Sequence, residues 1–204
     1  MRINKKKFIY LISPNKISKR FYYNLKLLLK TGKIKYFQLR LKKYSLNNKI
    51  LIGRKIKNIC NKNKVKFLVN DDPQLALRLC ADGCHLGQKD MNIKEAKKII
   101  GKKIIGVTCH NSLRLAKKAL KYKPSYLAFG AFHPSKTKKT KYVADIKIIG
   151  KIKKITKTPV VAIGGINYEN YKNLLLNNVN FLAISGYIWN NNKYKPLEAL
   201  DKFK

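Results

Sequence analysis

The sequence predicts an α/β fold, a single (β/α)8 barrel of the TIM type. Short apolar runs recur eight times along the 204 residues, and most are followed by a longer stretch rich in Leu, Ile and Lys. A continuous apolar run is typical of a strand buried on both faces, and amphipathic stretches are typical of helices that cover a parallel sheet. Eight β-then-α units therefore favour a closed barrel with its helices outside.

The predicted strands are short and follow one another at regular intervals. They comprise residues 8–13, 36–40, 66–70, 83–87, 104–109, 126–130, 160–165 and 181–186. The stretches that we expect to form helices include FYYNLKLLLK, LNNKILIGRKIKNICNK, PQLALRLC, NIKEAKKIIG and SLRLAKKALKY. An open doubly wound sheet is the alternative. It would require a Gly-rich dinucleotide loop after an early strand, and LISPNK at the end of the first run is not such a loop.

The chain shows no linker, composition shift or low-complexity tail, so we expect one domain over residues 1–204. This length is at the small end for the fold, and insertions must therefore be few. From residue 190 onward the sequence is short and rich in Asn and Lys, which predicts a reduced last helix.

The net charge of +38 is the most unusual property of the composition. Such a charge indicates nucleic acid, an anionic membrane or an anionic substrate as partner. However, the charge is mostly Lys, it is spread over the whole chain, and it accompanies abundant Asn, Ile and Tyr, as in proteins from AT-rich genomes. A dedicated nucleic-acid binder more often has a clustered patch that includes Arg. We therefore expect small phosphorylated molecules as partners and no specific nucleic acid.

Membrane and disulfide signals are both weak. The apolar run at residues 8–12 is too short for a signal sequence, and no stretch approaches the roughly 20 apolar residues of a membrane span. Cys60, Cys80, Cys84 and Cys109 form no CxxC pair and no zinc-ligand spacing. Together these features predict a cytoplasmic protein with reduced thiols and no membrane association.

Acidic residues are scarce, yet four of the nine lie within VNDDPQLALRLCADGCHLGQKD. Asp72 precedes Pro73 and is expected to cap a helix, and Asp82 is expected to lie in a turn. Asp71 and Asp90 follow two neighbouring predicted strands. Because Mg²⁺ prefers oxygen ligands and usually takes one or two carboxylates plus substrate phosphates and water, these two residues predict one Mg²⁺ site per subunit.

Cationic and glycine-rich segments follow other predicted strands. Arg40, Lys42 and Lys138 are suited to binding phosphate oxygens. Gly164-Gly165 and Ser185-Gly186 follow the last two strands, where barrels commonly bind a phosphate through backbone N–H groups. The pattern predicts one diphosphate and one monophosphate, on two substrates. His110 and His133 are expected to pack or to form hydrogen bonds rather than to act as bases.

The segments QLRLK, VNDD, ADGCHLGQKD, GVTCH, FGAFHPSKTKK, VVAIGGI and LAISG occur in this order. In them the chain resembles the thiamine phosphate synthase family from about residue 8 to residue 190. The resemblance implies a barrel-shaped transferase of thiamine biosynthesis. Such an enzyme joins 4-amino-5-hydroxymethyl-2-methylpyrimidine diphosphate to a thiazole phosphate and releases pyrophosphate.

The resemblance also implies roles for individual residues. The pyrimidine diphosphate site would comprise Gln38, Leu39, Arg40, Leu41, Lys42, Asn70, Thr108 and Lys138. The thiazole phosphate site would comprise Ser135, Lys136, Thr137, Gly165, Ile184 and Ser185. Asp71 and Asp90 would bind Mg²⁺, and the catalytic residues would be Arg40, Lys42, Lys138 and Thr108. Departures from the family pattern are mild: Thr108 stands where Ser is usual, Ser135 where Thr is usual, and Ala131 replaces a common Pro.

Three alternatives remain at this point. A thiazole tautomerase of the same fold would use one phosphorylated thiazole and would need neither Asp71 and Asp90 nor the diphosphate-binding cations. A non-enzymatic basic protein would bind nucleic acid with a steep salt dependence. A barrel could also have kept these residues and changed its substrate. A homo-oligomer is possible in each case.

Overall fold

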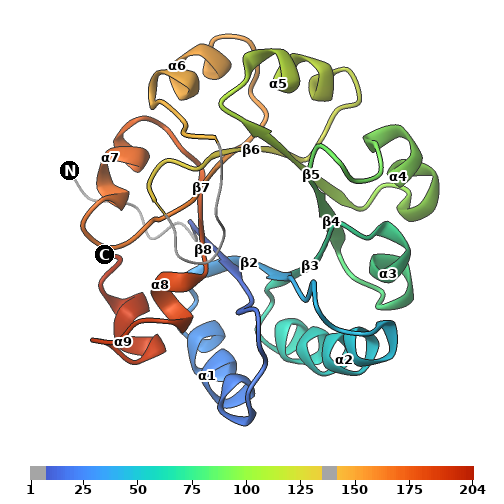
Figure 1. Cartoon of the computed structure of the whole chain (residues 1–204), viewed down its shortest axis with the longest axis vertical. Coiled ribbons are helices and arrows are strands. Elements are labelled where there is room, and N and C mark those ends of the chain that lie inside the picture. Colours follow the sequence, from blue (N-terminus) through green and yellow to red (C-terminus); the bar gives the residue numbers. More distant parts are fainter. Residues whose placement is uncertain (1–7, 135–141) are drawn as a thin grey trace.

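The computed structural model, which describes residues 8–134 and 142–204, is a closed barrel (Figure 1). Its strands pair in chain order and all pairs are parallel. They are β1 (Ile9–Ile12), β2 (Ile34–Leu39), β3 (Lys66–Asn70), β4 (Gly83–Leu86), β5 (Ile104–His110), β6 (Tyr126–Gly130), β7 (Val160–Ile163) and β8 (Phe181–Ile184). Each coincides with one of the predicted apolar runs, so the predicted barrel is confirmed.

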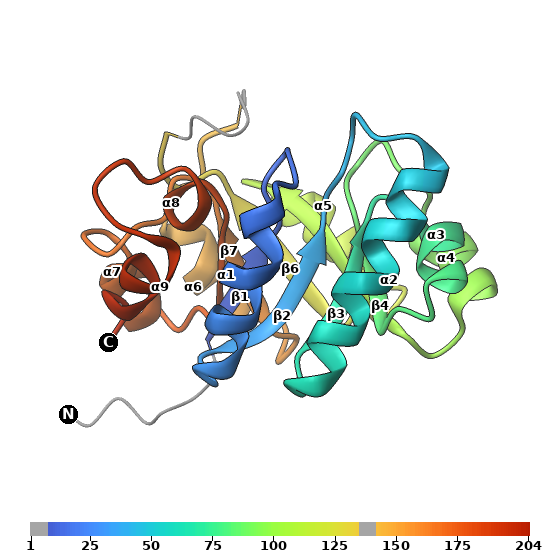
Figure 2. The ribbon, with the colours of Figure 1, turned by 90° about the horizontal axis from the view of Figure 1, so that it is seen from below.

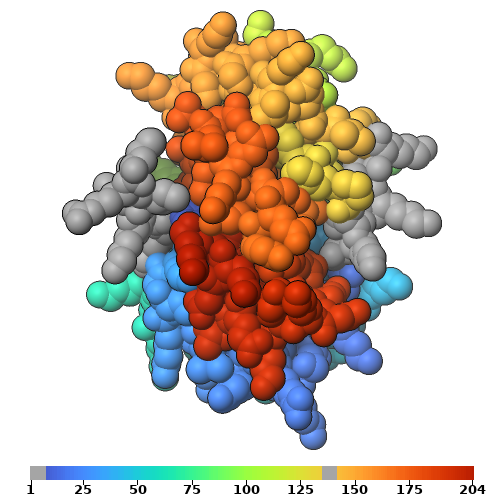
Figure 3. Space-filling view, turned by 90° about the vertical axis from the view of Figure 1, so that its left-hand side faces the viewer, coloured from blue at the N-terminus to red at the C-terminus, as the bar shows by residue number. Residues whose placement is uncertain are grey.

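Helices form a ring outside the barrel (Figure 1). They are α1 (Lys19–Lys30), α2 (Leu46–Lys62), α3 (Pro73–Arg78), α4 (Ile93–Ile100), α5 (Leu113–Leu120), α6 (Lys147–Lys153), α7 (Tyr171–Leu176), α8 (Gly186–Trp189) and α9 (Pro196–Asp201). The last helix, α9, is short, as predicted. Helix α9 nevertheless contacts α1 and α8, and Figure 3 shows the C-terminal residues in red between the orange and the blue segments.

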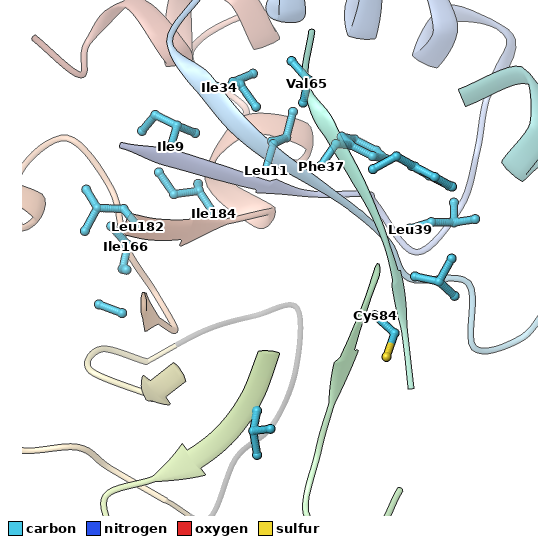
Figure 4. Close-up of a cluster of buried hydrophobic side chains, with 14 of the residues drawn as sticks. Ile9, Leu11, Ile34, Phe37, Leu39, Val65, Cys84, Ile166, Leu182 and Ile184 are labelled. Carbon is cyan, nitrogen blue, oxygen red and sulfur yellow. The ribbon is translucent and has the colours of Figure 1, made fainter. Parts of the chain in front are cut away.

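Both faces of the barrel wall are buried, which explains the continuous apolar runs. Alternate residues of each strand face outward and pack against the helices. Figure 4 shows Leu11, Phe37 and Ile184 in this outer cluster. The residues between them face the lumen, where Tyr10 and Tyr126 belong to a second, smaller cluster. The lumen is therefore a packed core rather than a pore.

Capping side chains begin the helices that follow β2, β3, β4 and β5. Each capping oxygen accepts a hydrogen bond from a backbone N–H group three residues later, which satisfies a donor that the helix leaves unpaired. The caps are Ser45, Asp72, Asn92 and Ser112. The expected cap at Asp72 is confirmed. Figure 2 shows the loops after β1 and β2 at the same end of the barrel.

Asp82 lies at the amino end of β4, in the bend that precedes this strand. Its carboxylate accepts hydrogen bonds from Lys57 (2.8 Å), Lys66 (3.0 Å) and the Phe67 amide (2.9 Å). Partial burial acts to raise the pKa of Asp82, but these three donors together lower it. Asp82 thus lies in the bend before β4, as expected, and it also ties this bend to α2 and β3.

Within the described ranges, no helix is both long and apolar enough to cross a bilayer. Cys60, Cys84 and Cys109 are buried, Cys80 is exposed, and all are free thiols. Burial raises the pKa of Cys84 and Cys109 to about 12. These two thiols are therefore protonated at neutral pH and pack as small apolar groups.

Candidate active site

Most of the predicted site residues lie at the carboxyl end of the barrel. Leu39, Asn70 and Ile184 are the last residues of β2, β3 and β8. Because parallel strands end at the same edge of a sheet, the segments that follow them meet at this end. The predicted residues Ser135, Lys136, Thr137 and Lys138 lie outside the residues that the structure describes.

Asp71 and Asp90 are close enough to influence one another. Burial raises the pKa of Asp90, and the nearby Asp71 carboxylate raises it further, against the opposing effects of the Gly87 amide and Lys42. Gly87 N–H donates to Asp90 Oδ2 at 2.6 Å, and Lys42 Nζ lies 3.1 Å from Asp71 Oδ2. Burial and the neighbouring carboxylate thus both disfavour the charged form of Asp90, and a bound cation would favour it.

Asp71 occupies an unusual backbone conformation. Its φ of 66° lies in the left-handed region, which non-glycine residues seldom adopt. The Asp71 amide donates to the carbonyl oxygen of His85 at 2.7 Å, which fixes the end of β3 against β4. Strained residues of this kind persist where the surrounding structure holds them, and they cluster at functional sites.

The QLRLK segment is fixed by a residue that the sequence analysis missed. Ser13 is 2% exposed, its amide donates to Gln38 O (2.9 Å), and its Oγ accepts from Arg40 N (2.9 Å). Ser185 Oγ donates to Ser13 O at 3.2 Å, so this residue joins the ends of β1, β2 and β8. The Arg40 guanidinium is itself oriented by Asn15 Oδ1 at 3.0 Å. Its position as a polar residue at the end of the first apolar run could have identified Ser13 as a site residue.

Gly164 and Gly165 allow the segment after β6 to approach β7. Their φ angles are 99° and 59°, in the region that favours glycine. A Cβ atom on Gly164 would lie 2.3 Å from the Ala131 Cβ, and one on Gly165 would lie 2.2 Å from the Pro134 carbonyl oxygen. His133 N–H donates to Gly164 O across this contact at 3.2 Å. The glycine pair is therefore required by geometry, whichever ligand it serves.

A hydrogen-bonded network in the lumen joins two predicted substrate-binding residues. Gln38 Nε2 donates to the Tyr10 hydroxyl (3.1 Å), which lies 2.7 Å from the Tyr126 hydroxyl. The Tyr126 hydroxyl lies 2.9 Å from His85 Nδ1, and His85 Nε2 lies 2.8 Å from Thr108 Oγ1. Tyr10, His85 and Tyr126 were not among the predicted site residues. Their polar groups, at lumen-facing positions of otherwise apolar strands, could have identified these residues from the sequence.

A cavity of about 380 Å³ opens beside Asp71, on the outer flank of the β2 and β3 ends. It is lined by Leu39, Leu41, Lys42, Lys49, Val69, Asn70, Asp71, Asp72 and Leu75. Lys49, from α2, was not predicted. It lines the same cavity as Lys42, Asp71 and Asp72. His110, in contrast, stacks on Tyr142 with ring centroids 4.0 Å apart, which is the packing role that we expected.

Comparison with known proteins identifies the family. A family model described as thiamine monophosphate synthase matches residues 9–188. The chain belongs to this family. A thiamine-phosphate synthase from Pelagibacter ubique is 64% identical over 207 residues, with 100% of both chains covered. One from Rhodospirillum centenum is 37% identical over 184 residues and covers 89% of both. The resemblance inferred from the motifs is thus confirmed.

Solved structures support the same assignment. Thiamine phosphate pyrophosphorylase from Pyrococcus furiosus superimposes with a TM-score of 0.85 at 28% identity and covers 98% of this chain and 95% of its own. A 3-hexulose-6-phosphate synthase superimposes with a TM-score of 0.65 at 12% identity, covering 96% and 98%. The latter likeness concerns the barrel alone. The pyrophosphorylase from Pyrococcus furiosus therefore shares its fold with this chain over nearly the whole length.

Proposed function

We propose that this protein condenses 4-amino-5-hydroxymethyl-2-methylpyrimidine diphosphate with a thiazole phosphate to give thiamine phosphate and pyrophosphate. The observation that carries the proposal is the carboxylate pair, Asp71 and Asp90, held beside Lys42 at the carboxyl end of a barrel of this family. A thiazole tautomerase would need neither the pair nor the diphosphate-binding cations. The proposal takes the whole chain, residues 1–204, as one domain acting in the cytoplasm.

Two sets of residues are proposed to bind the substrates. The pyrimidine diphosphate site comprises Gln38, Leu39, Arg40, Leu41, Lys42, Asn70, Thr108 and Lys138. The thiazole phosphate site comprises Ser135, Lys136, Thr137, Gly165, Ile184 and Ser185. The ends of β1, β2 and β8 are joined through Ser13, and this supports placing the two sites side by side. Such fixed positioning is what a reaction between two bound substrates requires.

Asp71 and Asp90 are proposed to hold one Mg²⁺ ion. Their oxygen donors are of the type that Mg²⁺ prefers, and burial together with the nearby Asp71 carboxylate raises the pKa of Asp90, which a bound cation would counteract. Among the described residues, no three His, Cys, Asp or Glu side chains are grouped as metal ligands. A two-carboxylate site completed by substrate and water matches the usual Mg²⁺ pattern. When bound, the ion would supply positive charge to the diphosphate oxygens.

The proposed reaction needs no nucleophile from the protein. The bond between the pyrimidine methylene carbon and the diphosphate oxygen breaks, and pyrophosphate leaves with the bonding electrons. The electron-rich aminopyrimidine stabilises the resulting cation, and the thiazole nitrogen then attacks the methylene carbon. Arg40, Lys42 and Lys138 stabilise the charge that develops on the leaving group. The protein contributes positioning and electrostatic stabilisation.

A coupling assay tests the proposal. Purified protein is mixed with the pyrimidine diphosphate, the thiazole phosphate and Mg²⁺, and thiamine phosphate is detected directly. We expect product from the wild-type protein and none above background with Asp71→Ala or with EDTA. Asp201→Ala is the matched control, because it removes a carboxylate whose partner is the remote Lys33.

The possible outcomes separate the alternatives. Full Mg²⁺-dependent turnover by Asp71→Ala would overturn the metal assignment. No product from folded wild-type protein would overturn the proposed reaction and would direct attention to a tautomerase or to another phosphorylated substrate. Nucleic-acid affinity that falls steeply with salt and is unaffected by Asp71→Ala would support a binding protein instead.

A further inference from the structure

The lumen network, defined as Gln38, Tyr10, Tyr126, His85 and Thr108, spans the interior of the barrel. Its members come from β2, β1, β6, β4 and β5, so the connection crosses the lumen rather than following one sheet edge. Barrel interiors are usually filled by branched apolar side chains. A buried polar network of this extent must be fully paired to be tolerated, and then it fixes the orientation of its members.

The centre of the network is tightly enclosed. Tyr10 and Tyr126 are each 1% exposed, and His85 is 8% exposed. A Cβ atom on Gly106 would lie 1.8 Å from Tyr126 Cζ, so this glycine is required for the tyrosine ring to lie against β5. Burial raises the pKa of both tyrosines above the ordinary value. Both are therefore neutral phenols, which can each donate one hydrogen bond and accept others.

Through the network, the hydrogen bonds that Gln38 makes at one end are linked to those that Thr108 makes at the other. In the orientation that the structure gives Gln38, Nε2 donates to Tyr10. The Tyr10 hydroxyl can then donate to the Tyr126 hydroxyl, and the Tyr126 hydroxyl can donate to His85 Nδ1. In this arrangement each hydroxyl donates one hydrogen bond. His85 then carries its proton on Nε2 and donates it to Thr108 Oγ1, which keeps its own hydrogen for another acceptor. Gln38 correspondingly keeps Oε1 as an acceptor.

We propose that Tyr10, Tyr126 and His85 are positioning residues that couple the Gln38 carboxamide to the Thr108 hydroxyl. The coupled pair presents one acceptor and one donor to the aminopyrimidine of the diphosphate substrate. An aminopyrimidine carries the complementary pattern, with an amino N–H donor and ring-nitrogen acceptors. This inference rests on the proposed function, since Gln38 and Thr108 are there assigned to the pyrimidine diphosphate site.

Tyr126→Phe is the most direct test, because it removes the hydroxyl that joins Tyr10 to His85 and keeps the ring. Tyr36→Phe is the matched control. The Tyr36 ring lies 6.0 Å from that of Tyr126, and it is no part of the lumen network. Steady-state kinetics are measured with each substrate varied in turn. We expect Tyr126→Phe to lower kcat/KM for the pyrimidine diphosphate roughly tenfold or more, as for one lost hydrogen bond in a preorganised site.

Two further readouts separate positioning from general structural damage. The KM for the thiazole phosphate should stay at the wild-type value in Tyr126→Phe. The loss should also shrink when Thr108→Ala is already present, because the tyrosine acts in part through that hydroxyl. Tyr10→Phe removes the hydrogen bonds to Gln38 and to Tyr126 but keeps the one between Tyr126 and His85, and it should lower the same kcat/KM by a smaller factor. It replaces Tyr126→Phe in these assays if that variant does not fold.

The inference is overturned if Tyr126→Phe, or Tyr10→Phe in its place, behaves like Tyr36→Phe. It is also overturned if the KM for the thiazole phosphate changes as much as the KM for the pyrimidine diphosphate. The same holds if the fold-loss in kcat/KM of the double variant with Thr108→Ala equals the product of the two single fold-losses. If the wild-type protein makes thiamine phosphate and the network variants are equally active, only this inference fails and the proposed function stands. Wild-type protein that makes none would overturn the proposed function itself.

Discussion

Aspartates at the two ends of β4 experience opposite surroundings. Asp82, at the amino end, accepts hydrogen bonds from Lys57, Lys66 and the Phe67 amide, and its pKa is lowered. Asp90, beyond the carboxyl end, has a raised pKa because it is partly buried and faces Asp71. The amino end of this strand is therefore arranged for stability. At the carboxyl end, burial and a second carboxylate disfavour the ionised form of Asp90.

The largest expected effect comes from Asp90→Asn. Activity in the coupling assay should fall by roughly 100-fold or more, because metal-ion charge stabilisation is worth several kcal/mol. In EDTA at pH 7, the same variant should melt at a higher temperature than the wild type. The raised pKa means that the contribution of Asp90 to stability is complete below its unfolded pKa and is lost as the pH rises through its folded pKa.

Added Mg²⁺ provides the control for Asp90→Asn. The ion should raise the melting temperature of the wild type, because it binds the folded state, and should raise that of the variant less. An Asn variant that melts below the wild type at pH 7 in EDTA would contradict the idea that the carboxylate pair is electrostatically unfavourable.

Gly165→Ala should weaken substrate binding and packing at the carboxyl end of the barrel, and it leaves the charge there unchanged. The new Cβ would lie 2.2 Å from Pro134 O, on a residue whose φ is 59°. We expect the KM for the thiazole phosphate to rise roughly tenfold and the stability to fall by about 1–2 kcal/mol.

Gly150→Ala is the matched control for this substitution. Nothing lies within 4 Å of a Cβ at this position, which is exposed on α6. It should leave both KM values unchanged and stabilise the helix by up to about 1 kcal/mol. Equal effects of the two alanines on KM would show that the β7 loop has no part in substrate binding.

Asp82→Asn should affect stability and not chemistry. The amide cannot balance the charges of Lys57 and Lys66, so we expect a loss of about 1–3 kcal/mol. At this chain length the loss corresponds to a fall in melting temperature of about 2–4 °C per kcal/mol. Asp201→Asn breaks an exposed pair and should change the melting temperature little. A loss of activity per folded Asp82→Asn molecule would contradict the division between the two barrel ends.

The smallest expected effect is the pH dependence of the difference in unfolding free energy between the wild type and Asp82→Asn. Because the pKa of Asp82 is lowered, its contribution is present above the unfolded pKa of about 3.9 and is lost as the pH falls through the folded pKa. Urea unfolding of wild type and Asp82→Asn should therefore differ at pH 7 and converge below about pH 4. Curves that stay equally separated at pH 3 would show that the stabilisation does not come from the ionised carboxylate.

Local sequence patterns were sufficient to locate the barrel and part of the site. The apolar runs coincide with the strands, and Asp72 caps α3, because both depend on neighbours a few residues away. Asp71 and Asp90 could be paired because chain order places them after adjacent strands. Asp82 could not be interpreted in the same way, since its lysine partners lie 25 and 16 residues away.

The sequence alone was enough to predict the order of strands and helices, the family, and the end of the barrel at which the proposed site residues lie. These features follow from periodicity, caps and ordered motifs, which are all short-range. Only the tertiary structure decided which lumen-facing side chains meet. Tyr10 and Tyr126 are 116 residues apart, yet their hydroxyls lie at 2.7 Å. Closure of the barrel brings them together, because β1 and β6 are not neighbours in the sheet and face one another only across the lumen.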